Sequence, residues 1–240
     1  MQGWGSSHDE GFYQIEYFKN KSMVITFDTR GTGKSSRPDY PYTMDMFLDD
    51  IKNLLEYLKI NQKIHLYGHS FGGAIIQNFV LKYPDMVRTL ILDSTSAKTN
   101  SKQLFDAYSS MENMNPDQKC AVYFPTLFSR DYRKELKNNK ELYKKLKDIY
   151  MENPTTNKDY LNLIPMADEH DTRKLLHTIT HPTLIIAGNK DRIVPFQNSE
   201  YIHSELPNST LKILEGLGHG ACIEAADEVN DIIWNFIQKH

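Results

Sequence analysis

The sequence contains little cysteine, no long apolar run and no excess of positive charge, and each shortage excludes a class of protein. Its 240 residues include two cysteines, Cys120 and Cys222, which are too few and too far apart for a disulfide framework or a zinc cluster. No apolar run approaches the roughly 20 residues that a membrane-spanning helix needs. The formal net charge of −3 does not favour nucleic acid as the main partner.

The N-terminus also lacks the features of a secretory signal, because MQGWGSSHDEGF has neither a charged start nor an apolar core. Together with the low cysteine content, this predicts a cytoplasmic protein without stable membrane association. The His-Glu-x-x-His motif of zinc enzymes is absent. The string Gly31 to Ser35 (GTGKS) resembles a phosphate-binding loop, but the first glycine of that motif would fall on Asp28, so the motif is incomplete.

Short apolar runs alternate with longer amphipathic stretches in a composition that is 40% hydrophobic and 25% charged, as in globular proteins. The apolar runs predict strands at residues 22–28, 63–67, 87–92, 182–187 and 210–214. The amphipathic stretches predict helices at residues 43–58, with Thr43 as the N-cap, and at 72–82, 196–206 and 224–238. This alternation is typical of an α/β fold with a mostly parallel sheet flanked by helices.

The alternation stops between residues 97 and 177, where the pattern is helical and highly charged. We therefore expect a single α/β core formed by residues 1–96 and 178–240, with a helical cap or lid inserted at 97–177. His170 stands in an acidic patch near the end of this insertion and is expected at the surface. Aromatic and methionine side chains of the insertion are candidates for lining a substrate pocket: Phe105, Tyr108, Met111, Met114, Tyr123, Phe124, Phe128 and Met166.

The pentapeptide Gly68-His69-Ser70-Phe71-Gly72 has the form G-x-S-x-G and stands between a predicted strand and a predicted helix. A sharp turn at this place lifts a serine hydroxyl clear of the sheet, and it needs small neighbours. The helix N-terminus behind the serine favours developing negative charge. Ser70 is therefore the candidate nucleophile.

A serine nucleophile needs a base, and the candidates follow the last two predicted strands. Asp191 comes after the strand at 182–187, and His219 lies between glycines after the strand at 210–214. Both stand at the carboxyl ends of strands, where parallel sheets bind ligands. Asp93, at the end of an earlier strand, is a competing acid. Cys222 follows His219 by three residues, and we expect a buried thiol rather than a nucleophile.

These strings, with Phe27 to Ser35 (FDTRGTGKS) and Gly188 to Pro195, resemble the α/β-hydrolase superfamily, specifically its small capped serine esterases and lactonases. The resemblance runs from about Gly3 to the C-terminus. It implies a catalytic triad of Ser70, Asp191 and His219, with no metal or organic cofactor. It also implies an oxyanion hole formed by the backbone N–H groups of Phe71 and, by position, Trp4.

Two departures from the family pattern stand at the N-terminus. Gln2 takes the place of a usual histidine, which should weaken the bracing of the oxyanion loop more than catalysis. The usual N-terminal strands are also missing before Met1, and an absent interior strand would leave neighbouring backbone groups unpaired at about 1–3 kcal/mol each. We therefore expect that the natural chain starts upstream of Met1 or that this chain is a fragment.

The implied reaction is hydrolysis of a small-molecule carboxylic ester or lactone through an acyl-enzyme on Ser70. Carbon–carbon bond hydrolysis, aminopeptidase activity and perhydrolysis remain open on the same fold. So does a non-catalytic small-molecule receptor or signalling protein, because a fold does not determine a function. Neither the natural substrate nor the oligomeric state follows from the sequence.

Overall fold

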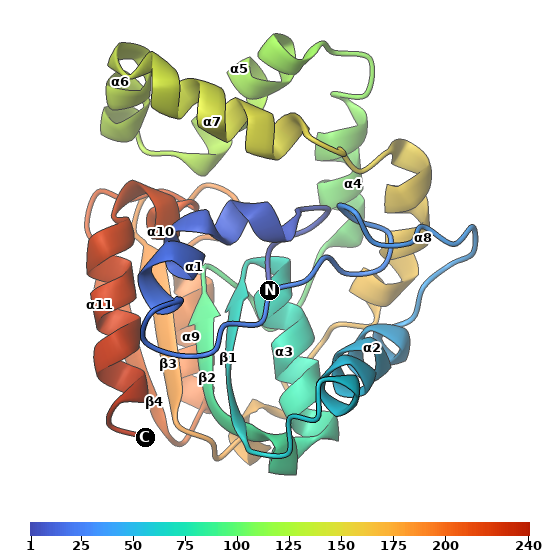
Figure 1. Ribbon diagram of the computed structural model, residues 1–240, viewed down its shortest axis with the longest axis vertical. Helices are drawn as coiled ribbons and strands as arrows, with labels where there is room; N and C mark the ends of the chain where they lie inside the picture. Colours follow the sequence, from blue (N-terminus) through green and yellow to red (C-terminus); the bar gives the residue numbers. More distant parts are fainter.

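A computed structural model describes residues 1–240 and contains one sheet of four parallel strands in the order β1-β2-β3-β4 (Figure 1). The strands are β1 (Ile64–His69), β2 (Val87–Asp93), β3 (Thr183–Gly188) and β4 (Ser209–Leu214). They confirm four of the five predicted strands. Because the strands are parallel, their carboxyl ends meet at one edge of the sheet, and the candidate acid and base both follow strands that end there.

The apolar side chains of the strands alternate between the two faces of the sheet and divide the core in two. Leu90, Leu92 and Ile185 belong to one hydrophobic cluster, while Ile91 and Leu184 belong to the other. This is the period of two that a strand imposes on its side chains. Both faces of the sheet are therefore covered by helices, as in other parallel sheets.

The helices that cover the first face are α2 (Met44–Tyr57), α3 (Phe71–Lys82) and α9 (Gln197–Glu205). The second face is covered by α1 (Phe12–Phe18), α10 (Ala221–Glu224) and α11 (Ala226–Ile237). Short 3₁₀ turns lie at His8–Gly11, Pro84–Met86 and Leu176–Thr178. Thr43 caps α2 as predicted, because its side chain accepts a hydrogen bond from the Met46 N–H.

Five helices lie between β2 and β3: α4 (Ser101–Ser109), α5 (Pro116–Leu127), α6 (Arg130–Asn138), α7 (Lys140–Met151) and α8 (Asn157–Asp168). Helices α5, α6 and α7 lie beyond the carboxyl ends of the strands, at the top of Figure 1. Their apolar side chains join the two core clusters: Tyr160 packs with the first and Phe124 with the second. No helix of the protein combines the length and the apolar character that crossing a membrane requires.

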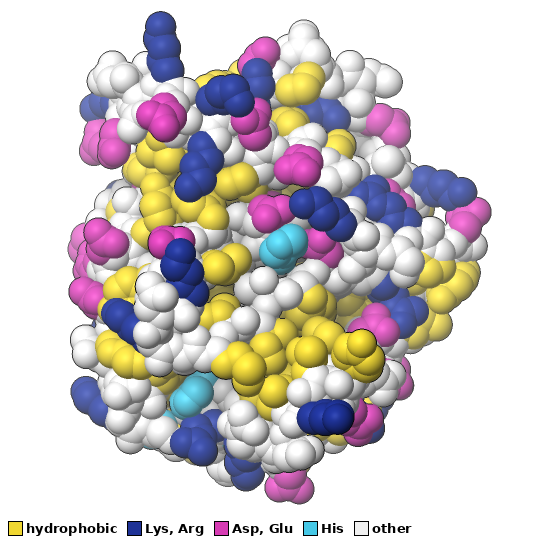
Figure 2. Space-filling view, viewed as in Figure 1, with side chains coloured by type: hydrophobic (Ala, Val, Ile, Leu, Met, Phe, Trp, Pro, Cys, Tyr) yellow, Lys and Arg dark blue, Asp and Glu magenta, His cyan; other side chains and the backbone are white.

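The predicted strand at residues 22–28 is wrong, because this segment forms no regular structure. A strand needs a neighbour to pair with, and none lies between this segment and β1. The outer edge of β1 instead meets Met1, whose carbonyl accepts a hydrogen bond from the His69 N–H at 2.9 Å. An apolar groove of about 520 Å³ separates the segment from β1. Hydrophobic side chains gather on this face of the molecule, in the lower half of Figure 2.

Candidate active site

Ser70 occupies the turn between β1 and α3 in a strained backbone conformation. Its φ of 53° and ψ of −122° are unusual for a residue other than glycine. The turn is tight enough that a Cβ on Gly68 would lie 2.5 Å from the carbonyl oxygen of Gly72. The serine N–H is tied to the neighbouring strand by a 2.8 Å hydrogen bond to the Asp93 carbonyl. The surrounding backbone therefore maintains the strained geometry predicted for the G-x-S-x-G motif.

The two expected oxyanion donors lie on either side of this turn. Phe71 is the first residue of α3, and its ring packs edge-on against the Trp4 ring at a centroid distance of 5.1 Å. Gly3, just before Trp4, contacts Ser70 so closely that a Cβ on Gly3 would lie 3.2 Å from the Ser70 Cβ. Neither the Trp4 nor the Phe71 N–H donates a hydrogen bond within the protein. Both donors are free to bind an oxyanion.

His219 and Asp191 form a buried pair at the carboxyl ends of β4 and β3. The Nδ1 atom of His219 lies 2.7 Å from Oδ2 of Asp191. The other carboxylate oxygen, Oδ1, accepts hydrogen bonds from the N–H groups of Ile193 and Val194, both at 2.8 Å. With both oxygens occupied, the carboxylate is held in one orientation. The pair has the geometry in which a carboxylate orients an imidazole and selects its tautomer.

The loop that carries His219 is braced by Glu224 and by the inserted helices. Oε1 of Glu224 accepts hydrogen bonds from the N–H groups of Gly218 at 2.9 Å and Ser129 at 3.0 Å. The Gly220 N–H donates to the carbonyl of Leu127 at 2.9 Å. Since Leu127 and Ser129 lie at the junction of α5 and α6, the insertion contacts the histidine loop directly.

Ser70 and His219 line the same small cavity, of about 20 Å³. No hydrogen bond joins the two side chains in this structure, and such contacts often tighten only when substrate binds. The fold thus brings all five expected site residues around one place: the serine, the histidine, its carboxylate partner and two free N–H donors.

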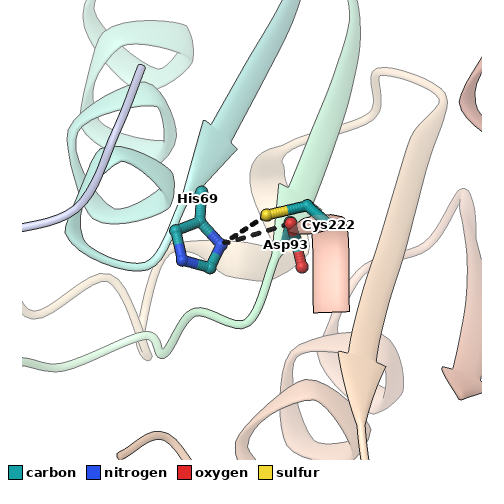
Figure 3. A group of neighbouring side chains, drawn as sticks. All are labelled: His69, Asp93 and Cys222. Carbon is teal, nitrogen blue, oxygen red and sulfur yellow. Dashed lines mark hydrogen bonds and ion pairs between the residues drawn. The ribbon is translucent and has the colours of Figure 1, made fainter. Parts of the chain in front are cut away.

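Asp93, the competing acid, is engaged elsewhere (Figure 3). The register of β1 and β2 places it beside His69, whose Nδ1 lies 3.2 Å from Oδ2 of Asp93. The Tyr67 hydroxyl donates to the same oxygen at 2.7 Å. Burial opposes charge on both residues, but the pairing outweighs it: the pKa of Asp93 lies below its usual value and the pKa of His69 lies above. This ion pair lies next to His219, because the ring centroids of His69 and His219 are 4.8 Å apart.

Cys222 completes this cluster, with its sulfur 4.0 Å from Nδ1 of His69. The ligand atoms of Cys222, His69 and Asp93 all lie within 4.8 Å of one another, so together they could hold a metal ion. The imidazole and the carboxylate already satisfy each other by pairing. Burial raises the pKa of the Cys222 thiol and favours its neutral form, as expected for a buried residue without a nucleophilic role.

A second chamber, of about 180 Å³, adjoins the small cavity. Six residues line both spaces: Trp4, Ser6, Glu10, Tyr108, Tyr123 and Tyr150. Of the eight pocket candidates named from the sequence, Tyr108, Met111 and Tyr123 line these spaces, whereas Phe124, Phe128 and Met166 are buried in the core clusters. Glu10 is a cavity-lining residue that the sequence did not predict, because a single glutamate outside any motif gives no signal. Burial raises its pKa to about 7.

His170 is fully buried, which corrects the expectation of a surface position. Its Nδ1 lies 2.8 Å from the amide nitrogen of Asn78, and its Nε2 lies 3.0 Å from the carbonyl oxygen of Ser96. Burial lowers the pKa of His170 to about 4, so the ring is neutral at physiological pH. The residue joins the end of the insertion to α3 and to the segment after β2.

Comparison with known proteins gives consistent matches over almost the whole chain. Residues 1–226 match the family model of the alpha/beta hydrolase fold. The chain is 28% identical to 3-oxoadipate enol-lactonase 2 of Acinetobacter baylyi, over 92% of this chain and 80% of the relative. It is also 28% identical to the proline iminopeptidase PfmaB of Pestalotiopsis fici, over 100% of this chain and 88% of the relative. Among solved structures, MGS-M2, an alpha/beta hydrolase enzyme from a Medee basin deep-sea metagenome library, superimposes with a TM-score of 0.87 at 25% identity and covers 99% of this chain and 87% of its own.

Proposed function

This chain belongs to the α/β-hydrolase family, and from that premise we propose that it is a serine hydrolase that cleaves carboxylic esters or lactones through an acyl-enzyme on Ser70. The observation that supports this most is the buried Asp191–His219 pair, 2.7 Å apart, whose histidine lines the same cavity as Ser70. A histidine held by a carboxylate beside a serine on a strained turn is the arrangement that activates a hydroxyl at neutral pH.

In the proposed reaction, His219 accepts the Ser70 proton while the serine oxygen attacks the substrate carbonyl. Asp191 keeps the imidazole in the required tautomer and stabilises its charged form. The N–H groups of Trp4 and Phe71 bind the oxyanion, and each such donor contributes about 10²–10³ in rate. The leaving alcohol takes the proton from His219. The same histidine then activates a water molecule that releases the acid and restores Ser70.

We propose that residues 97–177 act as the cap of this site and select the substrate. Tyr108, Met111 and Tyr123 of this insertion contribute to the cavity wall, and α5 and α6 hold the histidine loop. Because the relatives include a lactonase and an iminopeptidase, amide hydrolysis at a free amino terminus is a second candidate activity of the same serine.

The test is a paired assay of wild type and Ser70→Ala on p-nitrophenyl esters from acetate to decanoate, with a fluorophosphonate probe that labels active serines. Ser204→Ala is the matched control, since Ser204 lies on α9 at the surface. We expect labelling and turnover in wild type and in the control, and neither in Ser70→Ala. Turnover that survives in Ser70→Ala would contradict the proposal, as would a wild-type protein that neither labels nor turns over any ester of the series.

A further inference from the structure

The passage between the cavity at Ser70 and the outer chamber contains one charged side chain, Glu10. Its residue surface is only 9% exposed, yet it lines both spaces. A carboxylate in this position faces whatever enters the site. Burying a charged group without a partner costs free energy, so an ionised Glu10 needs a group to pair with.

No cation of the protein pairs with Glu10. Ser6 and the positive charge of His69, which is already paired with Asp93, lower its pKa, but neither forms an ion pair with it. The other acids of the outer chamber are satisfied at its rim: Glu152 lies 3.6 Å from Lys34, and the Asn157 amide donates to Glu112. The chamber also contains Lys119, which forms no ion pair with Glu10. Glu10 is thus an inner carboxylate without a counter-charge.

Aromatic side chains line the same spaces as this carboxylate. Four phenols, those of Tyr108, Tyr123, Tyr150 and Tyr160, lie near enough that the charge of Glu10 contributes to raising each of their pKa values, after the larger effect of burial. The tyrosines also contact one another. The Tyr108 and Tyr123 hydroxyls are 2.8 Å apart, and the Tyr108 and Tyr160 ring centroids are 5.0 Å apart.

The Trp4 ring stacks on Tyr160 at a centroid distance of 6.0 Å, and its indole N–H has no hydrogen-bond partner. Aromatic side chains, one unpaired indole N–H and one carboxyl group that ionises near pH 7 therefore belong to the residues that line these spaces. Aromatic faces and a carboxylate attract the same kind of ligand group, a cation.

We propose that this site takes an ester or amide substrate that carries a protonated amine close to its scissile carbonyl, with Glu10 and the surrounding tyrosine rings binding the ammonium group. The inference rests on the proposed hydrolase function. An ammonium group supplies the counter-charge that Glu10 lacks. A purely apolar acyl group offers no partner and leaves Glu10 protonated up to about pH 7, and an anionic group would be repelled by the ionised form.

The experiment compares two ligands of the same shape, L-alaninamide and isobutyramide, in which an ammonium group replaces a methyl group. Dissociation constants are measured by ligand-detected NMR titration at about pH 7, where an α-amino group is largely charged. The proteins are wild type, Glu10→Gln and the control Glu16→Gln, whose carboxylate is exposed on α1. Fluorophosphonate labelling of each protein is recorded in parallel.

We expect wild type and Glu16→Gln to bind L-alaninamide at least about tenfold more tightly than isobutyramide, and Glu10→Gln to bind the two within about twofold. Equal affinities in wild type would overturn the proposal without any variant. A preference that persists in Glu10→Gln would overturn the role of Glu10. Labelling separates this inference from the proposed function: ammonium selectivity without labelling contradicts the hydrolase alone, and labelling without selectivity contradicts the amine site alone.

Discussion

His219 Nδ1 lies 2.7 Å from Asp191 Oδ2, although the two residues are separated by 28 positions in the chain. They meet because β3 and β4 are adjacent and parallel, so that the loops after both strands leave from the same edge of the sheet. Asp93 lies at the same edge, at the end of the adjacent strand β2, but His69 and Tyr67 occupy its carboxylate. The strand register thus assigns one acid to each histidine.

Asp191→Asn should lower kcat by about 10³–10⁴, because an amide cannot stabilise the imidazolium and can favour the wrong tautomer. The two N–H donors from Ile193 and Val194 should still hold the side chain, so folding should be little affected. Steady-state kinetics on p-nitrophenyl acetate measures the loss, and thermal unfolding checks the fold. An Asp191→Asn protein with turnover within about tenfold of wild type would mean that another acid serves His219.

Asp93→Asn should mainly lower the stability of the protein, whereas Asp191→Asn should mainly lower kcat. The substitution leaves His69 buried beside a neutral amide, and breaking one partner of a buried pair costs about 3–5 kcal/mol. Urea denaturation should show this as a lower free energy of unfolding, and His69→Gln with Asp93→Asn together should recover part of it. Kinetics on the folded protein give the comparison with Asp191→Asn: a larger fall in kcat for Asp93→Asn would contradict the assignment of one acid to each histidine.

The residues of the proposed triad could be predicted from the sequence because local rules place them. The G-x-S-x-G string needs a strand–helix turn, and the structure has it at Ser70 with the expected strained backbone. Asp191 and His219 follow apolar runs that form β3, which is fully buried, and β4, which is buried only at its last residue. Thr43 was recognisable as a cap for the same reason, since capping depends on neighbours three residues away.

The features that the sequence did not predict depend on distant partners. Residues 22–28 have the composition of a strand, but a strand exists only where a neighbour pairs with it. His170 follows polar residues, yet Asn78 and the Ser96 carbonyl bury it. Glu10 becomes part of the site only because helices from the insertion bring tyrosines around it. For His170 and Glu10 the deciding contacts join segments that lie far apart in the chain, and residues 22–28 have no strand beside them.

Glu10→Gln should change how stability depends on pH. An unfolded glutamate loses its proton near 4.5, whereas folded Glu10 keeps it to about 7 because burial disfavours the charge. Between these values the folded chain binds a proton that the unfolded chain has released, so wild type loses stability as the pH rises through this window. Glutamine does not titrate. The free energy of unfolding of Glu10→Gln minus that of wild type should therefore grow by about 3 kcal/mol across the window and then stay level.

Urea denaturation at a series of pH values measures this difference, with Glu16→Gln as the control. The exposed Glu16 should give a difference that stays nearly constant with pH. If the Glu10→Gln difference also stays constant, or shrinks as the pH rises, then folded Glu10 is ionised at low pH and already has a partner for its charge.

His170→Gln should remove a separate loss of stability at acid pH. An unfolded histidine takes up a proton near 6.5, but folded His170 resists protonation to about 4, because burial disfavours the charged ring. As the pH falls from 6.5 to 4, the unfolded chain therefore binds a proton that the folded chain does not, and wild type is destabilised by up to about 3 kcal/mol. His170→Gln should start less stable at pH above 6.5, since it disturbs the contacts with Asn78 and Ser96, and then lose less stability on acidification.

The exposed His203 supplies the control, and His203→Gln should follow the wild-type curve. Parallel curves for wild type and His170→Gln, measured by urea denaturation, would show that the ring is protonated in the folded protein as readily as in the unfolded chain.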